Sequence, residues 1–299
     1  MKPEDFRRPQ YEPLKDQGKI RILIIEPASG DEPLRCKLEQ ISLQAQHSYD
    51  PSLPSYDALS YTWDAPIRTR HYQRGPSYAK QEFTFESFLA GSMNGGAYTA
   101  TDGTRPVNFA EQSDQVDEEG AMRPVEITVG GLQCDVTGNL ASALHHLRKP
   151  DSARRLWADA ICIDQGNLQE RGEQVQQMNR IYQSADTVHI WLGPTADGSD
   201  ASLILVRIMW HSKFLYHEDP MVLLRGDNLD QRMSALAAVE ELTVLLNRPW
   251  FTRRWVVQEL AFAREAIVHC GARTIEWPKL SYAVSVLEQY RLELTYMRV

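Results

Sequence analysis

Cysteine is scarce in this sequence, and long apolar runs are absent. The four cysteines stand at positions 36, 134, 162 and 270 of 299 residues, without a Cys-x-x-Cys pair, and predict neither a zinc site nor a disulfide framework. The segment Met1 to Pro13 is charged and contains proline where a secretory signal needs an apolar stretch. No segment approaches the length of a membrane span. We therefore expect reduced thiols, no membrane span and a cytoplasmic location.

An excess of basic residues is also missing. Lys and Arg number 32 against 40 Asp and Glu, which gives a net charge of -8 and a pI of about 5.5. Because a phosphate backbone attracts a basic surface, this balance disfavours nucleic acid as a partner. An apolar content of 42% is enough to bury a sizeable core. One large domain that carries insertions is the expectation.

Apolar runs predict strands, and most of them alternate with helical patterns. Repeated alternation of strand and helix favours an α/β fold with an open parallel sheet flanked by helices, whose ligand crevice lies outside the carboxyl ends of the strands. Gly130-Gly131 predicts a two-residue hairpin. The expected strands are 20–26, 34–39, 56–63, 125–129, 132–136, 156–163, 187–192 and 266–270, and the expected helices are 140–147, 170–184, 201–210, 229–246, 255–260 and 278–294.

Two segments interrupt this alternation. Residues 67–123 are rich in Gly, Ser, Thr, Gln and acidic residues without periodicity, and they predict a long insertion. Residues 195–247 carry two amphipathic patterns and predict a helical insertion. The first 55 residues are expected to form an N-terminal β extension, and residues 278–299 a C-terminal helix.

The segment 248–260 is the most informative one. Trp255 and Glu259 are four residues apart, so a helix would place an indole and a carboxylate on one face, an arrangement that suits a ring-bearing cationic substrate. Thr252 is the expected N-cap, with Trp250 and Phe251 as apolar residues ahead of the helix. The alternative is structural: a core aromatic beside a carboxylate that pairs with Arg253, Arg254 or Arg264.

Four blocks carry a family resemblance. Residues 56–63, 156–165, 170–193 and 248–260 resemble, in this order, the blocks of the heterokaryon incompatibility (HET) domain. The resemblance covers about 56–66 and 125–277, which makes 56–277 the expected HET domain with its two insertions. Asp64 stands where the family usually has glycine. The resemblance implies a fungal module of non-self recognition and cell death, with an unknown protein partner.

HET domains are themselves similar to TIR domains, which have a flavodoxin-like parallel sheet. Residues 56–61, 184–193 and 255–260 carry this second likeness, and it implies that Glu259 is the catalytic carboxylate of an NAD nucleosidase. NAD would be a substrate, with no bound cofactor. Nicotinamide leaves the ribose as a neutral molecule, so one carboxylate that stabilises the oxocarbenium-like transition state suffices. Residues expected near the ligand, ranked below Glu259, are Trp255, Tyr61, Trp63, Asp164, Gln165, Trp191 and Gly193.

Simpler interpretations stand beside these. Asp159 and Asp164 are typical of loop caps or of pairs with an arginine such as Arg171, and Cys162 is typical of an inert core thiol unless His189 meets it. Four histidines without metal-ligand spacing are expected on the surface or on helix faces, and no metal is expected: His145, His146, His211 and His217. Two functions remain open, an NAD nucleosidase and a non-catalytic module that acts by self-association. Two alternatives also stay open for the chain itself, a whole protein or the front portion of a longer one.

Overall fold

The computed structural model describes residues 6–16, 18–43, 54–63, 124–196, 198–215 and 229–289. The expected insertion at 67–123, the Asp64 position and His217 lie outside these residues. The chain separates into two compact units. The first holds the strands β1 to β8 with α2 to α5, η3 and α9, and the second holds α6, α8, β9 and α10.

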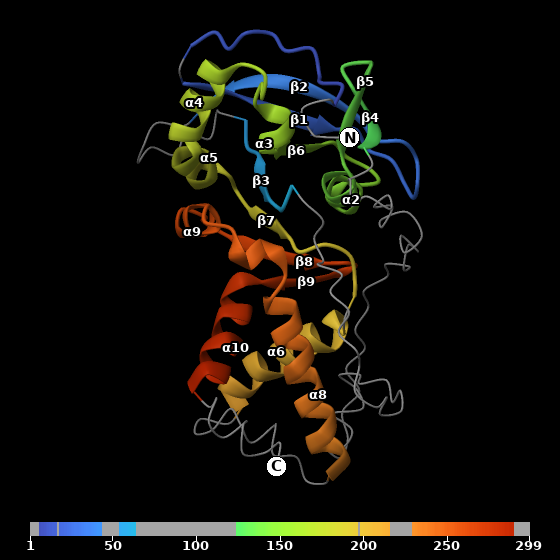
Figure 1. Cartoon of the computed structure of the whole chain (residues 1–299), viewed down its shortest axis with the longest axis vertical. Coiled ribbons are helices and arrows are strands. Elements are labelled where there is room, and N and C mark those ends of the chain that lie inside the picture. The colour runs from blue at the N-terminus through green and yellow to red at the C-terminus, as the bar shows by residue number, and fades with distance from the viewer. Residues whose placement is uncertain are drawn as a thin grey trace. The chain divides into compact units, whose positions relative to one another are not determined.

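The first unit is built on one sheet, whose strand order is β5-β4-β2-β1-β6-β3-β7-β8 (Figure 1). The central strand β1 is mostly apolar and almost wholly buried, because it lies between the strands β2 and β6 and both of its faces are covered. The bounds are β1 Lys19–Ile25, β2 Arg35–Ser42, β3 Asp57–Ser60, β4 Pro124–Val129, β5 Leu132–Thr137, β6 Arg154–Trp157, β7 Val188–Trp191 and β8 Ala266–Cys270.

The fold is α/β as expected, but the sheet is mixed rather than parallel throughout. Strands β6, β3, β7 and β8 form a parallel set and β2 pairs in parallel with β4, while β1 runs antiparallel to both β2 and β6. The reason is the length of the connections. Residues 26–34 join β1 to β2, and the positive-φ pair Gly130 and Gly131 joins β4 to β5, both too short for a parallel crossover.

The four parallel strands have a specific order. Numbered along the chain as β3, β6, β7 and β8, they lie in the sheet as 2-1-3-4. The flavodoxin-like order begins in the same way. Strands β6 and β7 lie on opposite sides of β3, so the strand order reverses there, as it does at the point where open α/β sheets bind ligands.

The helices of the first unit depart from the expected bounds in two places. The strand expected at 156–163 ends at Trp157, and the chain turns at once into α3, where the Asp159 carboxylate accepts from the backbone N–H of Ala160 at 2.8 Å. The single helix expected at 170–184 is two helices that meet at Gln177. The helices are α2 Gly138–Leu147, α3 Asp159–Cys162, α4 Leu168–Gln176, α5 Met178–Ser184, η3 Pro249–Thr252 and α9 Val256–Ala261.

The second unit contains the two helices expected at 195–247. They are α6 Ser199–Leu215 and α8 Leu229–Leu246, which pack together. The strand β9 Arg273–Glu276 and the helix α10 Trp277–Gln289 complete the unit, and the rings of Trp210 and Tyr282 meet edge to face at 5.7 Å. In the part of the chain that is described, no helix is long and apolar enough to cross a membrane.

Candidate functional site

The candidate site lies where β3 ends. Ser60 is its last residue, and Tyr61, Thr62 and Trp63 follow directly. Strand β6 ends beside it and leads through Ala158 into Asp159 at the start of α3. Because parallel strands present their carboxyl ends at one edge of a sheet, these side chains and α9 meet there.

Glu259 is enclosed at this edge. It is 1% exposed, and its carboxylate accepts a hydrogen bond from the Ser60 hydroxyl. The indole N–H of Trp250 donates to the same Ser60 oxygen at 2.7 Å. Ser60 therefore connects a buried indole to a buried carboxylate, and α9 is fastened to the end of β3.

Arg253 completes the surroundings of Glu259. Its Nη2 donates to Glu259 Oε1 at 3.1 Å and its Nη1 to Oε2 at 3.4 Å, while 22% of the arginine side chain is exposed. Of the three arginines weighed as partners of Glu259, Arg253 forms an ion pair with it. Burial raises the pKa of Glu259, and the charge of Arg253 works against that rise.

Trp255 does not share the surroundings of Glu259. It is 48% exposed, whereas Glu259 is buried. Trp255 does lie one helical turn before Glu259, since its carbonyl accepts from the Glu259 N–H at 3.1 Å, but the exposed indole and the buried carboxylate are not presented together. Thr252 does not cap this helix, since its hydroxyl donates to the carbonyl of Pro249 within η3.

Asp159 is the second carboxylate of the site. Its Oδ2 accepts from the indole N–H of Trp63 at 3.0 Å, and both residues keep partial exposure. Burial raises the pKa of Asp159, while the Arg253 charge lowers it. The nearby Tyr61 hydroxyl is buried, and burial together with the charge of Asp159 raises the pKa of Tyr61 well above its usual range. One guanidinium therefore balances two carboxylates.

Two of the expected ligand residues serve the packing of α2 or the backbone. Trp191 is buried, and its indole N–H donates to Asn139 Oδ1 at 2.8 Å. Gly193 has φ of 101°, which only glycine adopts readily, and its carbonyl accepts from the N–H of Gly271 at 2.9 Å. Neither contact involves Glu259.

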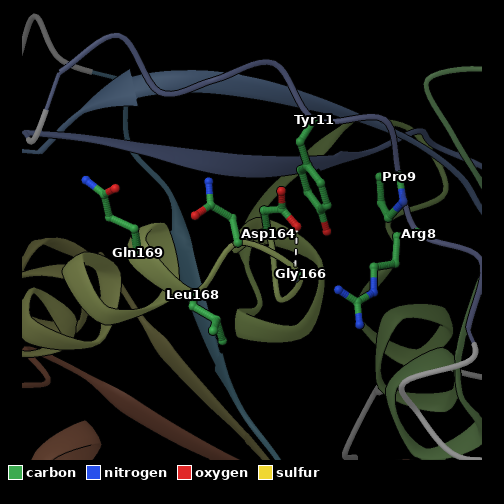
Figure 2. A pocket seen from close by; sticks show the side chains of 8 residues that line it. Arg8, Pro9, Tyr11, Asp164, Gly166, Leu168 and Gln169 are labelled. Atoms are coloured by element: carbon green, nitrogen blue, oxygen red, sulfur yellow. Dashed lines mark hydrogen bonds between the residues drawn. The ribbon is translucent and has the colours of Figure 1, made fainter.

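Asp164 and Gln165 separate from one another. Asp164 lines a broad, open hollow of about 870 Å³ between the N-terminal segment and the start of α4, together with Arg8, Tyr11 and Leu168 (Figure 2). Its Oδ1 accepts from the N–H of Gly166 at 3.0 Å, a local loop contact of the kind expected as the simpler interpretation. Gln165 instead donates to the carbonyl of Asp159 at 2.9 Å, which ties it to the candidate site.

Cys162 is a core thiol. It is buried, its pKa is raised to about 12 by burial, and its sulfur contacts the carbonyl of Leu156 rather than His189. Among the residues that the structure describes, no three His, Cys, Asp or Glu side chains are placed to hold a metal ion. Ser60 was not singled out in the sequence. Its neighbours Tyr61 and Trp63 pointed to the right strand end.

The sequence is similar to a described family and to a known fungal protein. The family description "Heterokaryon incompatibility protein (HET)" matches residues 107–259, just over half of the chain. The chain belongs to this family. Heterokaryon incompatibility protein 6, OR allele, of Neurospora crassa is 29% identical over 288 residues, which cover 88% of this chain and 34% of that protein. The chain thus spans about a third of the length of this relative. No solved structure matches.

The HET match contains most of the charged residues of the site. It includes Asp159 and Arg253 and ends at Glu259, while Ser60 and Trp63 precede it in the sequence. The fold brings the two groups together, because β3 lies between β6 and β7. The HET segment and the strand ahead of it therefore form one site.

Proposed function

We propose that this chain acts in fungal non-self recognition as a trigger of cell death, and that it does so as a non-catalytic module that self-associates. Membership of the HET family supports the biological role, and the relative from Neurospora crassa is itself named a heterokaryon incompatibility protein. The role is transferred from that name and from the resemblance.

The state of Glu259 carries the proposal. Its carboxylate is 1% exposed and is occupied by the Ser60 hydroxyl and by both terminal nitrogens of Arg253. A catalytic carboxylate must reach its substrate, whereas a structural carboxylate is satisfied within the protein. In this arrangement Glu259 anchors α9, which favours a signalling surface over a reaction centre.

The outer side of the same segment offers such a surface. Trp255, Val257 and Phe262 are large apolar residues that remain exposed around α9. Exposed aromatic and apolar side chains are typical of the centres of protein interfaces. The occupant we propose is a second copy of this chain.

The test is light scattering across protein concentration. Wild type should show a rise in mean mass with concentration, and Trp255→Ser should raise the dissociation constant at least tenfold. Leu168→Ser is the matched control, because Leu168 is exposed, is large and apolar, and lies on α4. A protein that remains a monomer at every concentration and still kills fungal cells would contradict the proposal.

A second candidate, NAD cleavage through Glu259, is favoured by the position of the site. The cluster lies at the point of the sheet where open α/β folds bind ligands, and two carboxylates there have raised pKa values. The likeness to TIR domains points to the same carboxylate. For this chemistry the Arg253–Glu259 pair must part, after which the carboxylate would stabilise the oxocarbenium-like transition state.

Incubation with NAD separates the two candidates. Purified protein is assayed for free nicotinamide from low to high concentration, because assembly can complete a site. Glu259→Gln keeps the size of the side chain, and Glu265→Gln is the control at an exposed position of the same unit. Release that Glu259→Gln abolishes and Glu265→Gln preserves would establish the enzyme. If no nicotinamide is released at any protein concentration, and Glu259→Gln still causes cell death, the enzymatic candidate is excluded.

A further inference from the structure

Three histidines form a continuous chain on the face of the sheet that α2 covers. His146 Nε2 of α2 lies 3.0 Å from His269 Nδ1 of β8, and His269 Nε2 lies 2.9 Å from His189 Nδ1 of β7. The chain ends at Arg154 and Asp57: Arg154 Nη1 is 2.8 Å from His189 Nε2 and 2.7 Å from Asp57 Oδ2. The imidazole nitrogens face one another in pairs.

The hydrogen-bond direction of this chain is determined by its arginine end. A guanidinium has donors only, so His189 Nε2 accepts from Arg154 and the proton of His189 is on Nδ1. That proton is donated to His269 Nε2, which places the proton of His269 on its own Nδ1. The same step then places the proton of His146 on Nδ1. All three rings are therefore neutral Nδ1–H tautomers.

One more proton on His146 or His269 does not fit this chain. Each close pair of nitrogens shares a single hydrogen, so protonation of either ring sets two N–H groups against each other at about 3 Å. At the far end His189 Nε2 lies 3.3 Å from Asp57 Oδ2 as well as beside Arg154, so a proton on His189 has a carboxylate to meet. The charged groups that face the chain are Arg154 from β6, Asp57 from β3 and Lys149 after α2, and the burial of the rings disfavours a further charge.

The same helix also holds the candidate site. Asn139, in the first turn of α2, donates to the carbonyl of Thr62 at 2.7 Å and to its hydroxyl at 3.1 Å. The side-chain amide oxygen of Asn139 accepts from the indole N–H of Trp191, and the Trp191 ring contacts the His146 ring at a centroid distance of 5.1 Å. Thr62 lies between Tyr61 and Trp63, so the seating of α2 fixes the exit of β3.

We propose that the chain His146–His269–His189 is an acid-sensitive latch, which fastens α2 to the sheet while His146 and His269 are neutral and releases it when they are protonated. Release would free Thr62 and loosen the end of β3. The pKa values agree: burial lowers that of His146 to about 4 and that of His269 to about 2. The latch is independent of whether the site cleaves NAD.

Hydrogen exchange measures the opening. When they are released, His146 and His269 regain a pKa near 6.5, so at pH 5.0 each of these two favours the open state roughly thirty-fold. After correction for intrinsic rates, the protection of the α2 amides from Leu140 to Leu147 should fall at least a hundredfold between pH 7.5 and pH 5.0. The amides of β1 should lose less of their protection from exchange over the same pH range. Equal loss in α2 and β1 would overturn the proposal, because α2 would then open only with the whole unit.

His146→Gln is the decisive variant. Its amide oxygen can accept from His269 Nδ1–H but does not titrate, so the acid-induced loss of α2 protection should shrink about thirty-fold. His211→Gln makes the same change on α6 of the other unit and should keep the full response. An unchanged response in His146→Gln would refute the latch.

Nitrogen NMR of the wild type gives a readout that needs no variant. At pH 7.5 the imidazole shifts of positions 146, 189 and 269 should report three Nδ1–H tautomers, although the Nε2–H form is the usual one. At pH 5.0 the His146 signal should show exchange with a protonated form in step with the loss of protection. Nε2–H tautomers at these positions would overturn the proposal even if α2 opened in acid.

Discussion

Arg253 is the residue on which the charge balance of the site depends, because its cation acts on both Asp159 and Glu259. We expect Arg253→Gln to lower the free energy of unfolding by about 2 to 3 kcal/mol at pH 7.5, less than for a wholly buried pair, since the arginine keeps partial exposure. Its exposed neighbour gives the control: Arg254→Gln should cost less than about 0.5 kcal/mol. Urea denaturation measures both.

The pH dependence of that loss has a definite sign. The pKa of Glu259 is raised in the folded protein, so the folded state binds more protons than the unfolded state above about pH 4.5, and this contribution to stability declines as the pH rises. Removing Arg253 raises the pKa further. The difference in unfolding free energy between Arg253→Gln and wild type should therefore be largest at pH 7.5 and smaller at pH 5. A difference that is constant with pH would indicate packing alone.

Ser60 offers a second test at the scale of one atom. Ser60→Ala removes the oxygen that connects Trp250 to Glu259 and leaves a buried indole N–H without its acceptor. We expect a loss of about 2 to 4 kcal/mol in unfolding free energy, since two buried polar groups lose a partner. Ser152→Ala, at an exposed position, should change stability by less than about 0.5 kcal/mol in the same denaturation series. Equal losses in both variants would contradict the role of Ser60.

At the scale of elements, α4 depends on one buried ion pair. Arg21 of β1 donates to both carboxylate oxygens of Glu170 at 2.5 and 3.0 Å, and the N–H of Asp164 donates to the same group at 2.9 Å. Glu170→Gln would leave the Arg21 charge buried without its counter-ion, which should cost about 3 kcal/mol. Glu173→Gln on the same helix is the control, with an expected cost below about 0.5 kcal/mol.

Acid should reduce the effect of Glu170→Gln. Burial works against the ionised form of Glu170, but the Arg21 hydrogen bonds outweigh it and lower its pKa. A carboxyl with a lowered folded pKa stabilises the protein above the unfolded value near 4.5, and that stability is lost as the pH falls through the folded pKa. The difference in stability between wild type and Glu170→Gln, measured by thermal unfolding, should become smaller below pH 4.5. A difference that grows there would contradict a lowered pKa for Glu170.

The strands and helices also show which sequence signals were sufficient to predict them. The strands around 56–60, 188–191 and 266–270 were predicted because their apolar runs are bounded by turn residues, and the Gly130-Gly131 hairpin because two glycines permit positive φ. The strand predicted at 156–163 ends early because Asp159 begins α3, a local polar contact within an otherwise apolar run. Helical spacing placed Trp255 one turn before Glu259, where its carbonyl accepts from the Glu259 N–H at 3.1 Å, but spacing does not encode that the indole is exposed and the carboxylate buried.

For the whole molecule, the limit of sequence reasoning was contact between distant segments. Glu259 and Arg253 are six residues apart and were weighed as a pair, whereas Ser60 lies 199 residues from Glu259 and carried no signal of its own. The histidine chain was missed for the same reason. His146 was expected on the surface or a helix face, yet its partner His269 is 123 residues away on β8. Strand order brings such residues together, and spacing along the chain does not encode it.

The stability of the whole molecule in acid should be controlled by His146 and His269 of the histidine chain. The pKa values of His146 and His269 are lowered to about 4 and about 2, so the unfolded state binds more protons than the folded state below pH 6.5. Stability is full above that pH and falls as the pH decreases, by about 2 kcal/mol for each histidine at pH 5. The raised pKa of Glu259 acts in the opposite direction and reduces the net loss. The variant His146→Gln/His269→Gln should therefore show a much shallower decline in urea-unfolding free energy between pH 7 and pH 5, whatever its stability at pH 7. The same slope in variant and wild type would mean that other groups govern the response to acid.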